Sequence, residues 1–222
     1  MASRLSEIFE DAKLIEKIQR RLPYLFQIAA IESSRAGKTG MEVGIPREKI
    51  LIALLVYRFG EENVDTNIPA TEPEIDAKLL GYPISVKTIT GNGRVKIGWT
   101  VDAQKAREFR ETYAPKCDVL LARIKWDSRG DLFFIPLGVQ KKVFADVGRE
   151  RYIKLPKPGT NPRGVEYSSE ALRKLTNDPQ TKSIQIQWQK SRIEYKPYQR
   201  WLDYWKKKKL HFDKRDMQTK IA

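Results

Sequence analysis

Acidic residues alternate just ahead of a β-branched segment that carries a lysine. Glu72, Glu74 and Asp76 recur at every second position, so a strand here would place their three carboxylates on one face. Residues 84–89 are rich in β-branched side chains and predict a second strand, on which Lys87 lies. Two neighbouring strands of this kind would bring carboxylates close to an ammonium group. Such side chains can hold a divalent cation and steer a water molecule; the alternative is a charged strand face that meets solvent.

The spacing of these residues suits hydrolysis of a phosphodiester bond. That reaction requires a cation that neutralises developing charge and a water positioned for in-line attack. Mg²⁺ prefers one or two carboxylates and keeps several waters, and a nearby lysine can polarise the attacking water. A site that holds the cation and the water in this way has one acid, a spacer of about ten residues, and then a second acid two positions before a lysine. Asp76 precedes Lys87 by 11 residues, and Ser85 occupies the place of the second acid.

The scarcity of cysteine and histidine excludes several other chemistries. Cys117 is the only cysteine, so neither an internal disulfide nor a zinc cluster can form. His211 is the only histidine, which excludes nucleases that need two histidines at a metal or a histidine nucleophile in a repeated motif. We expect His211 to be a surface or packing residue. Catalysis must therefore depend on carboxylates and lysine.

Basic residues greatly outnumber acidic ones. The 222-residue chain has 42 Lys and Arg against 28 Asp and Glu, a net charge of +14. A protein this basic usually binds a polyanion, and nucleic acid is the first candidate. No apolar run reaches the ~18 residues of a membrane span, and the N-terminus lacks a signal-peptide pattern. We therefore expect a cytoplasmic protein with no membrane segment and a core of its own.

Two helical regions precede the acid-lysine segment. Apolar spacing predicts helix over 5–35, interrupted at Pro23. Pro46 suits the start of a second helix, whose residues 50–56 are almost all apolar and therefore buried. Glu48 shares a stripe with the core residues of that helix. It is either a first-turn acid favoured by the helix dipole or a functional acid that needs a partner in the interior.

Strand and turn signals follow the acid-lysine segment. An Asn-Gly turn predicts an antiparallel hairpin between 84–90 and 94–101, and a helix follows over 102–113. Two further strands are predicted over 118–126 and 132–139. The order of elements indicates an α/β or α+β fold with a mixed central sheet flanked by helices.

The chain is expected to consist of an N-terminal helical region with the core over 1–150 and a C-terminal extension over 151–222, packed on the same domain. The extension contains, in order, a linker over 152–164, a helix over 168–175, a strand over 184–189 and an aromatic helix over 198–205 that runs into Lys206–Lys209. The aromatic stripe of the last helix favours core or dimer contacts over base stacking. Its lysines either cover the helix C-terminus or contact phosphate.

Over Asp76 to Lys87 the chain resembles the PD-(D/E)xK nuclease family, and over most of its length a type II restriction endonuclease of that family. The resemblance implies a mixed sheet flanked by helices and metal-dependent cleavage of both strands of DNA. It also implies a homodimer on a palindrome, because a two-fold protein reads a two-fold site. The palindrome implied by the narrower resemblance is CGCG.

The resemblance also assigns roles within the site. Ser85 departs from the family pattern, since serine is a poor magnesium ligand, but some members supply the missing acid from an upstream helix. Glu48 fits that place. Glu48 and Asp76 would then bind Mg²⁺, the carbonyl of Val86 would add an oxygen, and Lys87 would orient the nucleophile. Ca²⁺ or Na⁺ would occupy the site without turnover.

Four further residues are candidates for DNA contact. Met41, a flexible apolar side chain in a loop, could wedge between base steps, although loop methionines more often pack locally. Lys38, Arg94 and Lys96 are predicted to contact phosphates or bases, and each is also compatible with an ordinary surface charge.

Two other functions are compatible with the same residues. The first is a non-catalytic basic DNA- or RNA-binding protein, in which the acids are solvated and binding is salt-sensitive. The second is a nuclease of the same family that recognises a branched or damaged structure, as a resolvase or a repair enzyme does.

Overall fold

The computed structural model describes residues 4–35, 44–69, 72, 74–91, 93–157 and 164–206. The chain divides into two compact units, Met1–Ser191 and Arg192–Ala222. The first contains the β-sheets with their flanking helices, and the second contains α7 (Gln199–Lys206).

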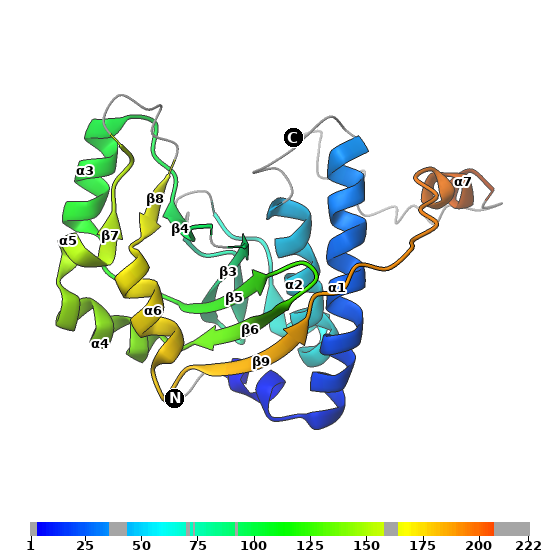
Figure 1. Cartoon of the computed structure of the whole chain (residues 1–222), viewed down its shortest axis with the longest axis horizontal. Coiled ribbons are helices and arrows are strands. Elements are labelled where there is room, and N and C mark those ends of the chain that lie inside the picture. Colours follow the sequence, from blue (N-terminus) through cyan, green and yellow to red (C-terminus); the bar gives the residue numbers. More distant parts are fainter. Residues whose placement is uncertain are drawn as a thin grey trace, which may run out of the picture. The chain divides into compact units, whose positions relative to one another are not determined.

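A six-stranded mixed sheet forms the centre of the first unit (Figure 1). In spatial order its strands are β1 (Val64–Asp65), β2 (Ala77–Leu79), β3 (Tyr82–Thr90), β5 (Asp118–Ile124), β6 (Arg129–Ile135) and β9 (Lys182–Gln187). β3 and β5 are parallel, whereas the other neighbours are antiparallel. The predicted mixed sheet is confirmed.

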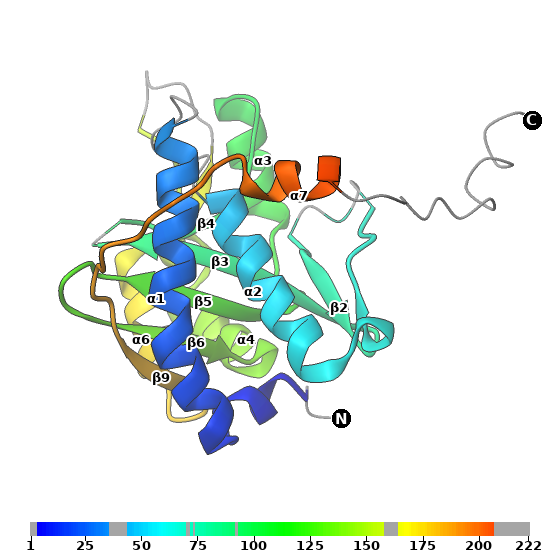
Figure 2. The same ribbon diagram turned by 90° about the vertical axis from the view of Figure 1, so that its right-hand side faces the viewer.

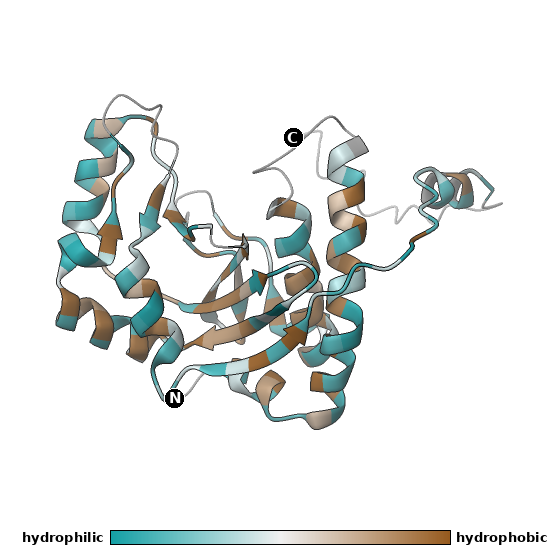
Figure 3. Ribbon diagram, in the orientation of Figure 1, coloured by the Kyte–Doolittle hydropathy of each residue, from teal (hydrophilic) through white to brown (hydrophobic). Residues whose placement is uncertain are grey.

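One face of the sheet is covered by N-terminal helices (Figure 2). These are the 3₁₀ helix η1 (Arg4–Phe9), α1 (Ala12–Arg35) and α2 (Gly44–Phe59), and the short η3 (Glu61–Asn63) follows α2. Alternate residues of the central strands, such as Val86, Leu120 and Ala122, pack against them. Hydrophobic residues predominate along β5 and β6, whereas they alternate with hydrophilic ones along α1 (Figure 3).

α1 continues through Pro23, so the predicted interruption is wrong. An interior proline costs about 3 kcal/mol through a lost hydrogen bond and a clash with the preceding turn. Burial of a large apolar side chain contributes about 1.5–3 kcal/mol. Ile18 and Leu22 before the proline and Phe26 after it are all buried in the same core, so their burial outweighs the cost of the proline.

The other face of the sheet is covered by helices and a small second sheet. The helices are α3 (Ala103–Thr112), α4 (Leu137–Val147), α5 (Arg149–Tyr152) and α6 (Ser169–Asn177), and the second sheet has the order β4 (Lys96–Gly98), β8 (Val165–Tyr167), β7 (Ile153–Lys154). The predicted helix over 102–113 is confirmed as α3, and the Asp102 carboxylate caps it by accepting the N–H of Lys105 at 2.7 Å.

The predicted hairpin between 84–90 and 94–101 is wrong. β3 pairs instead with β5 in parallel over seven positions, from Ile84 to Thr90. The N–H of Gly91 donates to the carbonyl of Ile124 at 2.7 Å, which extends this pairing beyond the end of β3. The following strand β4 pairs with β8 in the second sheet.

The predicted strand over 132–139 is also only partly correct, because β6 ends at Ile135 and α4 begins at Leu137. The N–H of Leu137 donates to the Asp118 carboxylate at 2.7 Å. The first turn of α4 is therefore stabilised by a residue 19 positions earlier, a contact that local patterning cannot reveal.

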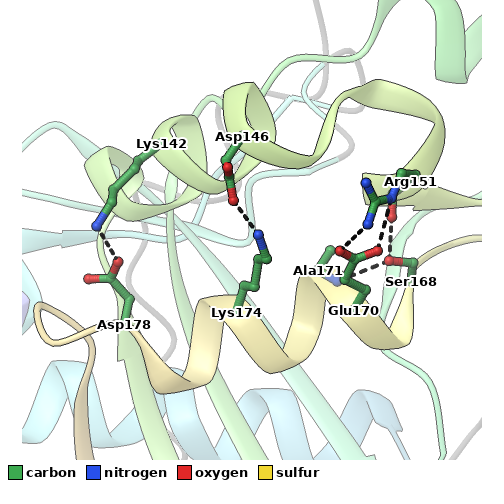
Figure 4. A network of polar contacts seen from close by, with 8 residues as sticks. All are labelled: Lys142, Asp146, Arg151, Ser168, Glu170, Ala171, Lys174 and Asp178. Carbon is green, nitrogen blue, oxygen red and sulfur yellow. Dashed lines mark hydrogen bonds and ion pairs between the residues drawn. The ribbon is translucent and has the colours of Figure 1, made fainter.

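Polar contacts join α6 to α4 and α5 (Figure 4). Lys142 and Lys174 form ion pairs with Asp178 and Asp146, and Arg151 binds Glu170. The predicted helix over 168–175 is confirmed, with the Ser168 hydroxyl accepting the N–H of Ala171 at 3.0 Å. Exposed pairs of this kind each contribute at most about 1 kcal/mol, so together they orient α6 more than they stabilise it.

The predicted C-terminal aromatic helix is present as α7 in the second unit. Two of its apolar side chains, Leu202 and Trp205, are exposed. Among the helices of the described residues, none is long and apolar enough to cross a membrane.

Candidate active site

Three consecutive residues of β3 hold the carboxylate of Asp76. Its Oδ2 atom accepts the N–H of Val86 at 2.7 Å, the hydroxyl of Ser85 at 3.2 Å and the ammonium of Lys87 at 3.2 Å. The other oxygen, Oδ1, accepts no hydrogen bond from the described residues. The acid and the lysine therefore meet as the sequence predicts, and Ser85 positions Asp76.

The other two acids of the alternating segment do not line the cavity described below, and Glu72, Glu74 and Asp76 all lie outside the strands. The N–H of Ile75 donates to the carbonyl of Glu72, which closes a turn and removes the two-residue alternation. Glu72 forms an ion pair with Lys78 at 3.1 Å. The prediction of three carboxylates on one strand face is wrong, and only Asp76 lines the cavity described below.

Glu48 follows the first turn of α2, which begins at Gly44, two residues before the expected start, and it lines the same cavity as Asp76 and Lys87. Its side chain is half-buried and forms no hydrogen bond with the described residues. Burial raises the pKa of Glu48 to about 7, while the nearby charges of Lys87 and Asp76 lower and raise it, respectively. Glu48 is thus close enough to both residues for their charges to affect it. The role of Glu48 as a functional acid stays a prediction.

A cavity of about 540 Å³ contains these groups. The start of α2, the end of β3 and residues 93–99 form its walls. Glu48, Asp76 and Lys87 line one part, and Arg94 and Lys96 line another.

Not every predicted DNA contact can be placed. Lys96 stacks its ammonium on Trp99, 3.7 Å from the ring centroid, and Arg94 lies 3.5 Å from the carboxylate of Glu166. Met41 and Lys38 lie outside the described residues.

Arg47 also lines the cavity and was not expected from the sequence. Its side chain is buried, its Nη1 donates to the hydroxyl of Thr90 at 2.8 Å, and its guanidinium lies 5.8 Å from the ring of Phe26. It forms no ion pair with a described acid, its Nε has no partner, and burial lowers its pKa to about 10. A cation in the first turn of a helix is disfavoured by the helix dipole, and this was the signal in the sequence.

The donor set of the cavity fits a hard divalent cation. Oδ1 of Asp76 and the Glu48 carboxyl accept no hydrogen bond from the described residues, and carboxylate oxygens are ligands that magnesium prefers. The N–H of Val86 points to Asp76, and the carbonyl of a strand residue points to the same side as its N–H, so the Val86 carbonyl is directed away from β5. Among the described residues no group of three or more His, Cys, Asp or Glu could hold a metal. The ion would therefore keep several water ligands.

A family model for the restriction endonuclease ThaI matches residues 8–207. The chain belongs to the ThaI restriction endonuclease family. A solved structure described as a restriction endonuclease in complex with substrate DNA is 55% identical, with a TM-score of 0.84; the match covers 91% of this chain and 99% of that chain.

Membership of the ThaI family accounts for the fold and the net charge. The chain is a type II restriction endonuclease, a DNA-cleaving hydrolase, and its mixed sheet flanked by helices is a restriction endonuclease fold. Such enzymes generally use a divalent metal, for which the cavity beside Asp76 has suitable ligands.

Proposed function

We propose that this restriction endonuclease hydrolyses both strands of DNA at the palindrome CGCG, with Mg²⁺ as cofactor and a PD-(D/E)xK type of site. One observation carries the proposal: Asp76, Lys87 and Glu48 converge on a single cavity. The CGCG target rests on the resemblance of the sequence. The protein would act in the cytoplasm as a homodimer, since a palindrome presents the same half-site twice.

Each group in the cavity has a role in this reaction. Asp76, Glu48 and the Val86 carbonyl would hold Mg²⁺. The ion, when bound, offsets the charge that develops on the phosphate and lowers the pKa of a bound water. Lys87 lies 3.2 Å from Asp76 and would orient the attacking water, while Ser85 fixes the direction of the carboxylate.

The remaining cations would bind the DNA backbone. Arg47, Arg94 and Lys96 line the cavity and would contact phosphates around the scissile bond. Lys38 is proposed to contact phosphate, and Met41 to wedge between base steps.

The test is cleavage of two linear duplexes that differ only in whether they contain CGCG or the same bases in another order. Wild type, Lys87→Ala and Asp76→Asn are compared in Mg²⁺, Ca²⁺ and EDTA. Lys13→Ala on α1 is the matched control, because Lys13 is exposed and does not line the cavity. We expect discrete fragments only from wild type and the control, with Mg²⁺ and CGCG, and a loss of on the order of 10³-fold or more in the two site variants.

Other outcomes would identify another function. Binding without Mg²⁺-dependent products in any variant would indicate a non-catalytic nucleic-acid-binding protein. Cleavage that follows branching and ignores sequence would indicate a structure-specific nuclease. Fragments from a duplex with another palindrome would retain the nuclease and reject CGCG.

A further inference from the structure

A second cavity, of about 380 Å³, adjoins the candidate active site. It lies where the parallel strands β3 and β5 end, and α6 forms its opposite wall. Ile89, Gly93 and Arg94 line both cavities, so the two are continuous along the segment that follows β3. A chain-like ligand in the first cavity could thus extend into the second.

The lining of the second cavity is basic. It contains the cationic side chains of Arg94, Arg123, Lys125 and Arg173 and no acidic side chain. These residues come from three places in the chain: the segment after β3, the end of β5, and α6. Like charges gathered in this way repel one another, and an anion bound between them would offset this electrostatic repulsion.

These cations are poorly neutralised by the protein. Arg123, Lys125 and Arg173 form no ion pair with an acid in the described part of the chain. Asp131 stands opposite Arg123 in the β5–β6 register, and even this pair makes no ion pair. Arg94 alone has an acidic partner, Glu166, at 3.5 Å.

The scaffold holds the cations in place. The stem of Arg123 lies beside Phe133, with its guanidinium 5.1 Å from the ring centroid, and leaves the sheet on the face that α6 covers. Arg173 is on α6, which the ion pairs in Figure 4 join to α4 and α5. The neutral polar side chains of Ser169, Thr176 and Asn177 also line the cavity and add hydrogen-bonding groups.

We propose that the second cavity binds a phosphate of the cleaved DNA strand that flanks the scissile phosphate. This inference rests on the proposed function, which places the scissile phosphate beside Asp76 and Lys87. Arg94, which lines both cavities, contacts the backbone between the two phosphates. Because phosphates carry no sequence information, this contact fixes the register of the strand in the active site and leaves base preference unchanged.

The experiment compares wild type with Lys125→Gln/Arg173→Gln, which removes two cations and leaves Arg123, beside Phe133, unchanged. Lys13→Gln/Arg20→Gln on α1 is the matched control, with the same change in net charge on exposed side chains that line neither basic cavity. Binding to the CGCG duplex is measured in EDTA at several salt concentrations. Each phosphate contact contributes about 0.9 to the slope of log K against log salt, so we expect the slope of the test variant to fall by about one and its affinity by roughly tenfold at low salt.

A second arm locates the phosphate. Each duplex in a series carries one neutral methylphosphonate, placed at a different phosphate of the CGCG site or its flanks. In wild type, one flanking position weakens binding; in the test variant, the same substitution has no additional effect. Lys125→Arg/Arg173→Lys, which keeps both charges, restores the wild-type pattern, and thermal melting shows that all variants are folded.

The inference is overturned if the test variant has the slope of the control, or if every methylphosphonate weakens binding equally in both proteins. Failure of the proposed function is distinguishable. Wild type would then produce no Mg²⁺-dependent fragments, whatever the binding data show. If wild type cuts CGCG but the test variant binds DNA like the control, the phosphate site is rejected and the proposed function is kept.

Discussion

Asp76 receives its three hydrogen bonds on one oxygen, so the other is directed by the protein and still open. A carboxylate fixed in this way does not have to be oriented when a cation arrives. The position of the second acid in the family pattern is filled by Ser85, whose hydroxyl contributes to this orientation instead of to coordination.

Ser85→Ala should therefore slow cleavage without changing DNA binding. A hydrogen bond to a charged group is worth about 1.5–3 kcal/mol, so the single-turnover rate should fall roughly 10- to 100-fold if the whole effect is expressed in the reaction. Ser183→Ala on β9 is the control, since Ser183 is exposed on a strand outside the site. An unchanged rate for Ser85→Ala would show that the Val86 amide and Lys87 suffice to position Asp76.

Arg47 gives a prediction in which stability and activity diverge. Its buried charge has no acidic partner among the described residues, so Arg47→Met removes a desolvation cost and keeps the packing of the stem. We expect a free energy of unfolding in urea equal to or above that of wild type, and DNA binding weakened by about tenfold or more. A variant destabilised by more than 2 kcal/mol that binds DNA normally would make Arg47 a structural residue.

At the scale of elements, α1 tolerates a proline because its buried face extends on both sides of it. Pro23→Ala should restore a backbone hydrogen bond to the helix, although it also increases the freedom of the unfolded chain by about 0.4–1 kcal/mol. We expect a net rise of about 1–2 kcal/mol in the urea unfolding free energy. A decrease would show that a kink at Pro23 is needed for α1 to fit the sheet.

The elements that the sequence predicts correctly are those with local signals. α3 has Asp102 as its cap, α6 has Ser168, and β9 alternates strictly, so each is predicted close to its observed bounds. The hairpin predicted after β3 was wrong and the start of α4 was missed, because distant residues decide both regions. β5 competes for the edge of β3, and Asp118 supplies the hydrogen bond at the start of α4.

The same distinction applies to the site. Asp76 and Lys87 lie on one short segment, and their spacing predicts their contact. The assignment of Glu48 to the site required the resemblance, because Glu48 lies on α2, far in the sequence from Asp76 and Lys87. Arg47 was missed since its partner Thr90 is 43 residues away, and Arg123, Lys125 and Arg173 were missed because only the tertiary structure brings them to one cavity.

For the whole molecule, the proposed palindrome predicts two copies of the chain per site. We expect sedimentation velocity to give twice the chain mass of 25.8 kDa, either for the free protein at micromolar concentration or once a CGCG duplex is added. A duplex with a single half-site should reduce dimer formation on DNA. One chain per intact duplex under all these conditions would contradict a two-fold arrangement.

The candidate active site contains more cations than acids. Arg47, Lys87, Arg94 and Lys96 surround Glu48 and Asp76, and Lys87 already neutralises Asp76 at 3.2 Å. The cavity therefore attracts the DNA backbone before any metal ion is present. On the proposed function, capture and cutting are separate events in time: the protein binds DNA and samples sequences without cutting, and it cuts only when a cation enters beside Asp76. Cleavage of a wrong sequence would then be limited at two successive steps, first by the fit of the DNA and then by the binding of the ion.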